Sequence, residues 1–400
     1  MQPDVIPEPR AAILSTPVVW FMSLAAALGT ASIYPLQPAI ADVAASMHAS
    51  LPTVGVALAC GPLGYLVGLA LLVPLVDRFS PRRVLSTQFG ALAVALGLNA
   101  VVGSPWLLGL VVGVIGAGSS VGAQLSSVAG RFATPVRRAT VLGIVTAGIS
   151  AGILLGRIVG GWLNDEIGWR GMFLVFAAAC AIVSVSARFV LPEAESSVSA
   201  GYLANLRKLP SLYVRVAPLR LAAGRGTLWF FSFCAVWAGL AVALSQPPFS
   251  YSSERIGLYA FAGLLGIVAT RVSGAWTDKV GARRVLLVGL VIALAATVTL
   301  GACLSNPAVT LACLALFDAG LFAAQVANQS TVLAIDPTAP AQFNSAYMLV
   351  YFIGGTLGTA FGAAAVGWFG WTATTAIAAC AIALAMIITV AARPKRRSLG

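Results

Sequence analysis

The sequence predicts an all-α membrane protein with twelve transmembrane helices arranged in two six-helix halves. Three observations lead to this fold class. The chain of 400 residues is 59% hydrophobic and only 9% charged, far less charge than covers a soluble domain. Its apolar residues form blocks long enough to cross a bilayer, which takes about 20 residues of helix. A charged string also occurs twice, as VDRFSPRRV at 76–84 and as TDKVGARRV at 277–285.

Each apolar block supplies one expected helix. The blocks are too long for the strands of an outer-membrane barrel, which alternate apolar and polar residues over about ten positions. Helices crossing the membrane are therefore the expected elements. In chain order we expect spans at 17–40, 52–76, 84–103, 106–128, 140–162, 171–191, 225–247, 257–276, 285–303, 307–331, 343–366 and 372–391.

The basic residues predict the topology. If the N-terminus is cytoplasmic, most of the 24 Lys and Arg residues fall on the cytoplasmic side, which is the positive-inside pattern of a multispan protein. Outside loops hold only Arg170 and Arg255, and Arg157 and Arg271 fall within spans. Both termini are then cytoplasmic. The net charge of +12 predicts contact with anionic lipid headgroups rather than with nucleic acid.

The second half of the chain repeats the first. Asp77 and Asp278 have the same separation as Gln124 and Gln325, and each charged string follows the second span of its half. Such a repeat indicates one bundle built twice. We expect a cytoplasmic tail at 1–16, a first half at 17–191, a polar cytoplasmic linker at 192–224, a second half at 225–391 and a basic tail at 392–400.

These features resemble the major facilitator superfamily along essentially the whole chain. That family carries a cytoplasmic turn of the form Gly-x-x-x-Asp-Arg/Lys-x-Gly-Arg-Arg after the second span. The first copy here departs from it at Val73, Ser80 and Pro81, and the second departs at Ala282. The matching residues are Asp77, Arg78, Arg82 and Arg83 in the first copy, and Gly274, Asp278, Lys279, Gly281, Arg283 and Arg284 in the second.

The charged turns have two interpretations. Basic residues after a span fix topology, which accounts for the arginines. It does not account for Asp77 and Asp278, because a carboxylate at the bilayer edge needs a hydrogen-bond donor such as an Arg or a helix N-terminus. The family resemblance implies that these carboxylates take part in a lock on the cytoplasmic face, formed when the protein opens outward.

The fifth span carries a second motif. Its glycines resemble the pattern Gly-x8-Gly-x3-Gly-Pro-x2-Gly-Gly of bacterial drug/proton antiporters, with Arg157 in place of the Pro. Small residues four apart let helix backbones approach closely, so either plain packing or a sealing surface between the halves explains them. The resemblance implies export of small organic molecules in exchange for protons. The glycines are Gly143, Gly152, Gly156, Gly160 and Gly161.

Ionisable residues inside spans are functional candidates by default. Asp318 lies deepest, and we expect it to carry the coupled proton; a structural hydrogen bond to a neighbouring helix is the alternative. Arg157 and Arg271 lie near span ends, so their long side chains can extend to the headgroups. For both we expect structural or gating roles rather than contact with the substrate.

Polar residues in the first and fourth spans of each half are candidate cavity residues. In the first span they form one stripe, which should face the bundle interior because a lipid-facing stripe is costly. In the superfamily these spans line the cavity. The candidates are Thr30, Tyr34, Gln37, Gln124, Gln246, Gln325 and Asn328.

The expected function is secondary transport by alternating access, as proton-coupled efflux of small organic molecules. Spans one and four lack a carboxylate, so proton-coupled or facilitated transport of a neutral or anionic metabolite is the alternative. A polytopic enzyme is disfavoured by the single His and the lack of paired intramembrane carboxylates; a non-transporting sensor would usually add a soluble domain. We expect a monomer in the bacterial inner membrane, without cofactor or metal.

Overall fold

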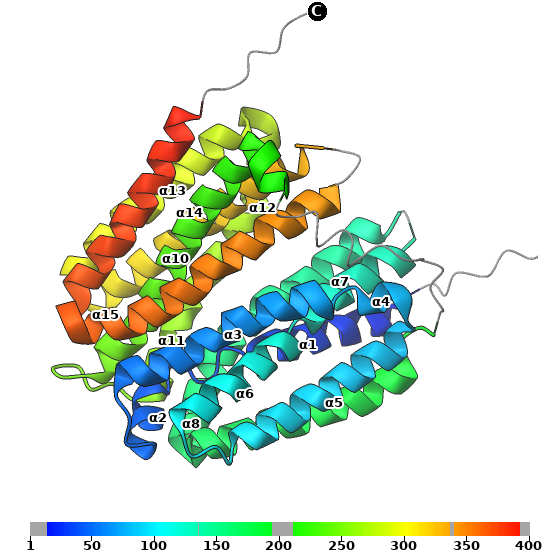
Figure 1. Ribbon diagram of the computed structural model, residues 1–400, viewed down its shortest axis with the longest axis horizontal. Helices are drawn as coiled ribbons and strands as arrows, with labels where there is room; N and C mark the ends of the chain where they lie inside the picture. Colours follow the sequence, from blue (N-terminus) through cyan, green and yellow to red (C-terminus); the bar gives the residue numbers. More distant parts are fainter. Residues whose placement is uncertain (1–13, 135, 194–210, 337–339, 393–400) are drawn as a thin grey trace, which may run out of the picture.

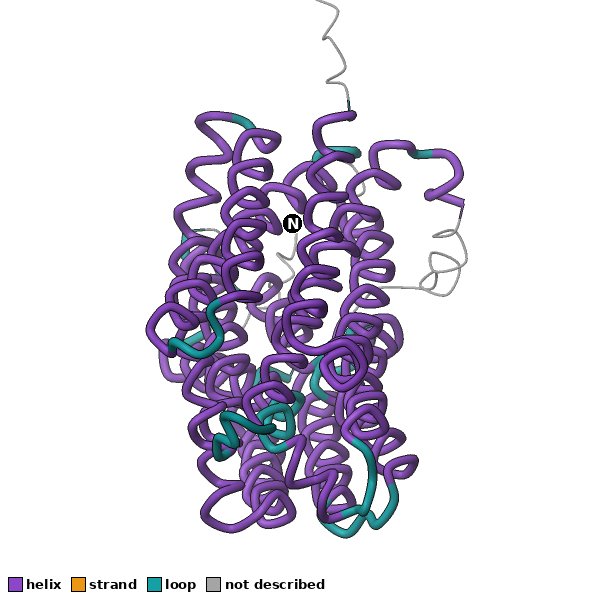
Figure 2. Tube along the Cα trace, turned by 90° about the vertical axis from the view of Figure 1, so that its left-hand side faces the viewer, coloured by secondary structure: helices purple, strands orange, loops and turns teal. Residues whose placement is uncertain are grey.

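The computed structural model describes residues 14–134, 136–193, 211–336 and 340–392. The expected tails at 1–16 and 392–400 and much of the expected linker at 192–224 therefore lie outside the described residues. In the part that is described, helices dominate and no strand occurs. Figure 2 shows long helices running side by side along one axis of the molecule. This arrangement confirms the predicted all-α fold class.

The first half extends from α1 to α8, and the second from α10 to α15 (Figure 1). The first comprises α1 (Thr16–Ala31), α2 (Ile40–Ser46), α3 (Leu51–Leu71), α4 (Leu75–Arg78), α5 (Pro81–Asn99), α6 (Pro105–Gly118), α7 (Val121–Phe132) and α8 (Arg138–Val190). The second comprises α10 (Ala217–Ser245), α11 (Ser253–Leu258), the 3-10 helix η1 (Tyr259–Ala262), α12 (Gly263–Val280), α13 (Ala282–Ala302), α14 (Pro307–Leu333) and α15 (Pro340–Ala391).

Two very long helices each supply two spans. α8 reverses at Gly168, with φ +74°, and α15 reverses at Gly370, with φ +80°. Only glycine adopts this region of φ readily. By length and composition, eight helices in the described part are apolar enough to cross a membrane. Dividing α8 and α15 at these glycines and adding the shorter α1 and the Arg-bearing α5 gives the predicted twelve passages.

Prolines shape the first span of each half. The block expected at 17–40 is interrupted, because α1 ends at Ala31 and α2 begins at Ile40. Pro35 and Pro38 lie between them and supply no backbone N–H for a continuous helix. In the second half, α10 begins at Ala217, earlier than expected, with Pro218 in its first turn, a position that proline favours.

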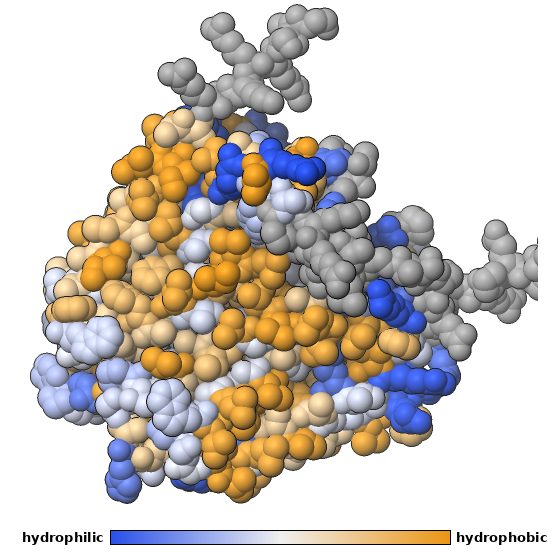
Figure 3. All heavy atoms as spheres, viewed as in Figure 1, coloured by the Kyte–Doolittle hydropathy of each residue, from blue (hydrophilic) through white to orange (hydrophobic). Residues whose placement is uncertain are grey.

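The surface agrees with a protein that faces lipid. Figure 3 shows apolar side chains spread over the molecule, with hydrophilic ones gathered toward the ends of the helices. Large hydrophobic side chains such as Val94, Leu110 and Phe189 are exposed. In water such a surface would drive association, whereas in a bilayer it contacts hydrocarbon. Trp106 and Trp368 are exposed near helix ends, where aromatic residues meet the headgroups.

Candidate functional site

The two halves contact each other at the ends that carry α2 and α11. There α3 packs against α15 and α8 packs against α11 (Figure 1). Near the charged turns, α4 packs against α5 and α7, and α13 packs against α12, α14 and α15, in each case within one half. If the charged turns are cytoplasmic, as the basic residues predict, the molecule is closed toward the outside.

Two carboxylates of the first half hold the start of α11 in the second. Asp165 accepts hydrogen bonds from the backbone N–H groups of Ser253 (3.1 Å) and Glu254 (2.9 Å). Asp42 accepts bonds from the hydroxyl of Ser253 (2.9 Å) and the amide of Asn164 (2.6 Å). Backbone N–H groups at a helix start favour an anionic acceptor. Sequence reasoning gave these carboxylates no role, because nothing local identifies partners in the other half.

Replacing Asp165 by Asn should loosen this outer contact. An acceptor without charge makes weaker hydrogen bonds, and a charged bond contributes about 1.5–3 kcal/mol. We expect the outward-open population to rise about tenfold, measured from distances between spin labels on the outer ends of α3 and α13. Glu166→Gln is the matched control, since Glu166 is exposed. Equal distance distributions for the wild type and Asp165→Asn would contradict the assignment.

Arg157 lies where the halves meet and contacts both of them. Its guanidinium stacks on the ring of Tyr34 (4.7 Å to the ring centroid) and on that of Trp237 (4.5 Å). Nε donates to Oε1 of Gln37 at 2.6 Å. The side chain is 5% exposed. The expectation that it extends to the headgroups is therefore wrong, because two aromatic faces attract the cation into the interior.

Asp318 is buried beside this arginine, at 2% exposure. Its Oδ1 accepts a hydrogen bond of 3.1 Å from the indole N–H of Trp237. Arg157 and Asp318 attract each other electrostatically, although no ion pair joins them in the described part of the chain. Trp237 of α10 thus touches both charged groups, Asp318 through its edge and Arg157 through its face. Sequence reasoning did not select Trp237.

Tyr34 and Gln37 lie at the same interface. Both line a small cavity of about 40 Å³, together with Thr359 and Ala363 of α15. The break between α1 and α2 places them on turn backbone, where Gln37 N–H bonds the carbonyl of Tyr34. Thr30 is buried further along α1, and its hydroxyl has no hydrogen-bond partner within the described residues. The structure thus places two of the three stripe residues beside Arg157.

Gln124 and Gln246 occupy other surroundings than those expected. Gln124 is fully buried inside the first half, where its amide donates to the carbonyl of Leu72 (2.6 Å) and to Gln88 (2.8 Å). These bonds join α7 to the end of α3 and to α5, and they satisfy a buried amide, which needs hydrogen-bond partners. Gln246 is exposed beyond the end of α10, where Pro247 and Pro248 follow and end the helix. The positions of these two residues do not support the prediction that they line the cavity.

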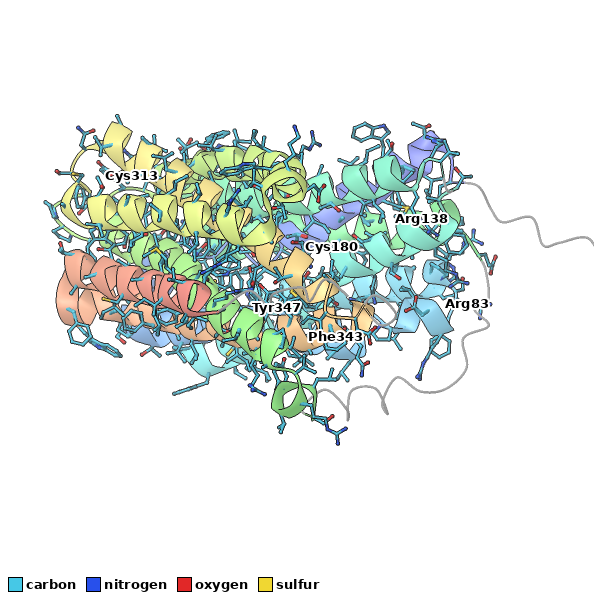
Figure 4. The ribbon with its side chains drawn as sticks, turned by 90° about the horizontal axis from the view of Figure 1, so that it is seen from above. Arg83, Arg138, Cys180, Cys313, Phe343 and Tyr347 are labelled. Atoms are coloured by element: carbon cyan, nitrogen blue, oxygen red, sulfur yellow. The ribbon has the colours of Figure 1, made fainter. Side chains whose placement is uncertain are left out.

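Gln325 and Asn328 belong to a polar network inside the second half. The hydroxyl of Tyr347 (labelled in Figure 4) donates to Oε1 of Gln325 at 2.6 Å and accepts from Nδ2 of Asn328 at 3.2 Å. Nε of Arg225 donates to Oδ1 of Asn328 at 2.5 Å. The network joins α10, α14 and α15. Sequence reasoning assigned Arg225 only to topology, and no local signal distinguishes the two roles.

In each half, one arginine of the repeated string joins two helices of that half. Arg82 bonds the carbonyl of Arg188 near the end of α8 and pairs with Glu193 at 2.8 Å. Arg283 donates to the carbonyl of Val390 near the end of α15 at 2.8 Å. In both halves the third span is thereby joined to the sixth. The other basic residues of the turns, Arg78, Arg83, Lys279 and Arg284, are exposed; Figure 4 shows Arg83 and Arg138 at the same end of the first half.

The two acidic residues of the turns differ from each other. Asp77 accepts a bond of 3.2 Å from the hydroxyl of Ser127, within its own half. Asp278 is exposed, and the described residues offer it no hydrogen bond or ion pair. Gly281 has φ +89°, so its turn needs a glycine, whereas a Cβ on Gly274 would meet no atom within 4 Å. The lock between the halves stays a prediction for the outward-open conformation.

The fifth-span glycines mainly pack within the first half. A Cβ on Gly152 or Gly156 would overlap the carbonyls of Ala27 or Ala31 of α1, and one on Gly160 would overlap Pro35. Gly161 instead faces Ser253 of the second half, so it belongs to the outer contact. Gly143 has open space around it, whereas Gly148 packs on Ser23. The regular spacing of four residues, and not the family pattern, identifies Gly148.

In the second half, α15 repeats this packing. Gly354, Gly358 and Gly362 pack on the carbonyls of Thr227, Phe231 and Ala235 of α10. Their spacing of four residues matches that of the α8 glycines. Both halves thus join their fifth span to their first through close backbone contact, so each half can move as a unit.

Comparison with known proteins agrees with this architecture. The model of the Major Facilitator Superfamily matches residues 19–339 and again 230–399. The chain belongs to this family. The "Uncharacterized transporter YgaY" of Escherichia coli O157:H7 is 30% identical over 377 residues, which cover 94% of this chain and 95% of that protein. A "Multidrug resistance protein B homolog" of Mycobacterium tuberculosis is 29% identical over 172 residues, which cover 41% of this chain and 32% of that protein.

Solved structures show the same fold at low sequence identity. The nucleoside transporter NupG has a TM-score of 0.77 at 12% identity, covering 94% of this chain and 99% of that one. A bacterial homolog of the human lysosomal transporter Spinster, in an inward-facing and unoccupied conformation, has a TM-score of 0.72 at 17% identity, covering 94% and 95%. The chain is therefore a multi-pass membrane protein with the fold of known transporters.

Proposed function

We propose that this chain is a proton-coupled secondary transporter of small organic molecules in the bacterial inner membrane. The two halves alternate between closure outside and closure inside around the interface that holds Arg157, Trp237 and Asp318. Asp318 carries the coupled proton. The substrate undergoes no chemical change, so the chain is not an enzyme, and no cofactor or metal takes part. A single copy is sufficient, because each copy has both halves of the pathway.

One observation carries this proposal, the link from Asp318 through Trp237 to Arg157. The indole N–H bonds the carboxylate at 3.1 Å and the indole ring contacts the guanidinium. Arg157 comes from the first half, whereas Trp237 and Asp318 come from the second. When the halves separate on the outer side, the carboxylate loses the nearby positive charge that favours its ionised form. Proton binding at Asp318 is thereby tied to the conformation of the transporter.

The direction of coupling depends on the charge of the substrate. Export in exchange for protons is the first candidate, supported by the glycine motif and by the multidrug resistance homolog. A cationic substrate would then compete with the proton for the negative charge of Asp318. Cotransport of a proton with an anionic metabolite is the second candidate, favoured by the buried Arg157. An anion would bind beside Arg157 once the proton has neutralised Asp318.

A pH jump across proteoliposomes tests proton coupling and its direction together. Vesicles contain one compound at equal concentrations on both sides, and the outside is then acidified. Exchange for protons expels the compound, whereas cotransport accumulates it; both orientations of the protein give the same sign, because a secondary transporter is reversible. Ethidium serves as the cationic probe and 2-naphthoate as the anionic one. Tracer equilibration without any net movement after the jump would exclude proton coupling.

A further inference from the structure

Aromatic side chains from both halves meet near Arg157. Tyr65 of α3 and Phe352 of α15 approach to 4.9 Å between ring centroids, across the two halves. Phe230 of α10 stacks on Tyr351 of α15 at 3.9 Å with an interplanar angle of 10°. Tyr34 lies in the neighbourhood of Tyr65 and Tyr351. These five residues are called the aromatic chamber below.

The chamber is only partly buried. Tyr34, Tyr65, Phe230 and Phe352 each keep part of their surface exposed. Tyr34 lies in the turn after α1, and the other side chains come from α3, α10 and α15, so both halves contribute. Accessible aromatic faces bind planar rings by offset or edge contacts. The composition of the chamber therefore favours a ligand with an aromatic ring over an aliphatic one.

Arg157 supplies the charge beside this chamber. Its guanidinium lies on the ring of Tyr34 and lines a small cavity with Gln37, Trp237 and Gly257. In the described part of the chain, its one hydrogen bond is that from Nε to Gln37, which leaves the terminal Nη1 and Nη2 groups unpaired. Nη1 and Nη2 are not among the fully buried unpaired polar atoms of the described residues, so a ligand can reach them. Two adjacent N–H groups fit a carboxylate in bidentate fashion.

We propose that the transported substrate is an aromatic organic anion, whose ring lies in the aromatic chamber and whose carboxylate or similar group binds Nη1 and Nη2 of Arg157. This rests on the proposed proton-coupled function and selects the second of its two candidates. The other titratable groups acting on Arg157 are Tyr34, Cys234 and Asp318. Of these, Asp318 competes with a substrate anion for the same cation. A proton on Asp318 removes that competition, so proton and anion bind together.

Equilibrium binding to the purified full-length protein tests the substrate class. The readout is quenching of tryptophan fluorescence, with the thermal shift as a second measurement. The probes are 2-naphthoate, its uncharged amide 2-naphthamide, the aliphatic anion hexanoate and the cation 2-naphthylmethylammonium. We expect 2-naphthoate to bind about tenfold more tightly than the amide, from one charge-assisted contact. Hexanoate should bind more weakly than 2-naphthoate by about three- to tenfold.

Variants assign the preference to the residues named here. Arg157→Gln should remove the preference for 2-naphthoate over the amide, and Arg157→Lys should keep part of it. Arg271→Gln, at an exposed arginine of α12, is the matched control and should bind like the wild type. Asp318→Asn should bind 2-naphthoate as tightly as the wild type or more tightly, because the competing carboxylate is gone. Should Arg157→Gln not fold, the probe series on the wild type still tests the ligand class, and Arg157→Lys still tests the role of Arg157.

Several results would overturn the proposal. If the amide or the ammonium probe binds as tightly as 2-naphthoate, the site does not require an anion. If hexanoate binds as tightly as 2-naphthoate, the site does not require an aromatic ring. Failure of all four probes to bind at millimolar concentration rejects the class. If Arg157→Gln keeps the preference for 2-naphthoate over 2-naphthamide, Arg157 does not bind the carboxylate. Because binding needs no pH gradient, a lack of proton-driven flux with normal 2-naphthoate selectivity would reject proton coupling alone.

Discussion

Replacing Asp318 by Asn should abolish net transport driven by a pH gradient. Asn has nearly the same shape as Asp and can still accept the bond from Trp237, but it cannot bind and release a proton. In the proteoliposome experiment, we expect net movement after the pH jump to fall to the level of vesicles without protein. Exchange of labelled for unlabelled substrate at equal pH should continue, because the halves can still alternate around a bound substrate.

Two further variants locate this effect. Trp237→Phe keeps a ring beside Arg157 but removes the N–H that bonds Asp318, so it should shift the pH dependence of transport without abolishing it. Glu166→Gln, at an exposed carboxylate, should transport like the wild type. Proton-driven flux that persists in Asp318→Asn would show that another group carries the proton. Loss of both exchange and driven flux in a folded variant would assign Asp318 to substrate binding or to helix packing.

Leucine at Gly156 should prevent the first half from folding. Even a Cβ at this position would meet the backbone of Ala31 in α1, at 2.5 Å from its oxygen. Overpacking a well-packed core costs about 1–3 kcal/mol, and backbone atoms cannot move aside as a flexible side chain can. We expect folded protein, measured as the monodisperse fraction after detergent extraction, to fall to a small part of the wild-type amount.

A matched glycine in the same helix provides the control. Gly143 belongs to the same family motif, but nothing lies within 4 Å of the Cβ it would carry. Gly143→Leu should therefore yield about as much folded protein as the wild type. Gly358→Leu, at the equivalent contact between α15 and α10, should resemble Gly156→Leu. Similar yields for the leucine variants at positions 143 and 156 would contradict the close-packing interpretation.

The glycines of the fifth-span motif share one family pattern but have different surroundings in the structure. They separate into those that join α8 to α1, one that contacts the other half, and Gly143, which packs on neither. The pattern itself gives no means to divide them, because it records spacing along one helix and not the helices around it. The repeat of small residues every fourth position in α8 and α15 was the more informative signal.

The sequence by itself determined the fold class, the twofold repeat and the depth of Asp318 in its span. These features depend on local chemistry, because a helix in hydrocarbon must satisfy its own backbone hydrogen bonds over a length set by the bilayer. Gly168 and Gly370, at which α8 and α15 reverse, lie between apolar blocks that the sequence already predicted to be separate spans. The linker and the tails stay predictions, since most of their residues lie outside the described part.

Only the tertiary structure decided which polar residues meet. From its place near a span end Arg157 can reach the headgroups, yet it lies between Tyr34 and Trp237. Gln246 was predicted to line the cavity, yet it lies beyond the end of α10. Each outcome depends on which face of a helix the other half covers, and residues far apart in the chain determine that. A single sequence gives the depth of a residue in its span, but its partners follow from the packing of twelve spans against one another.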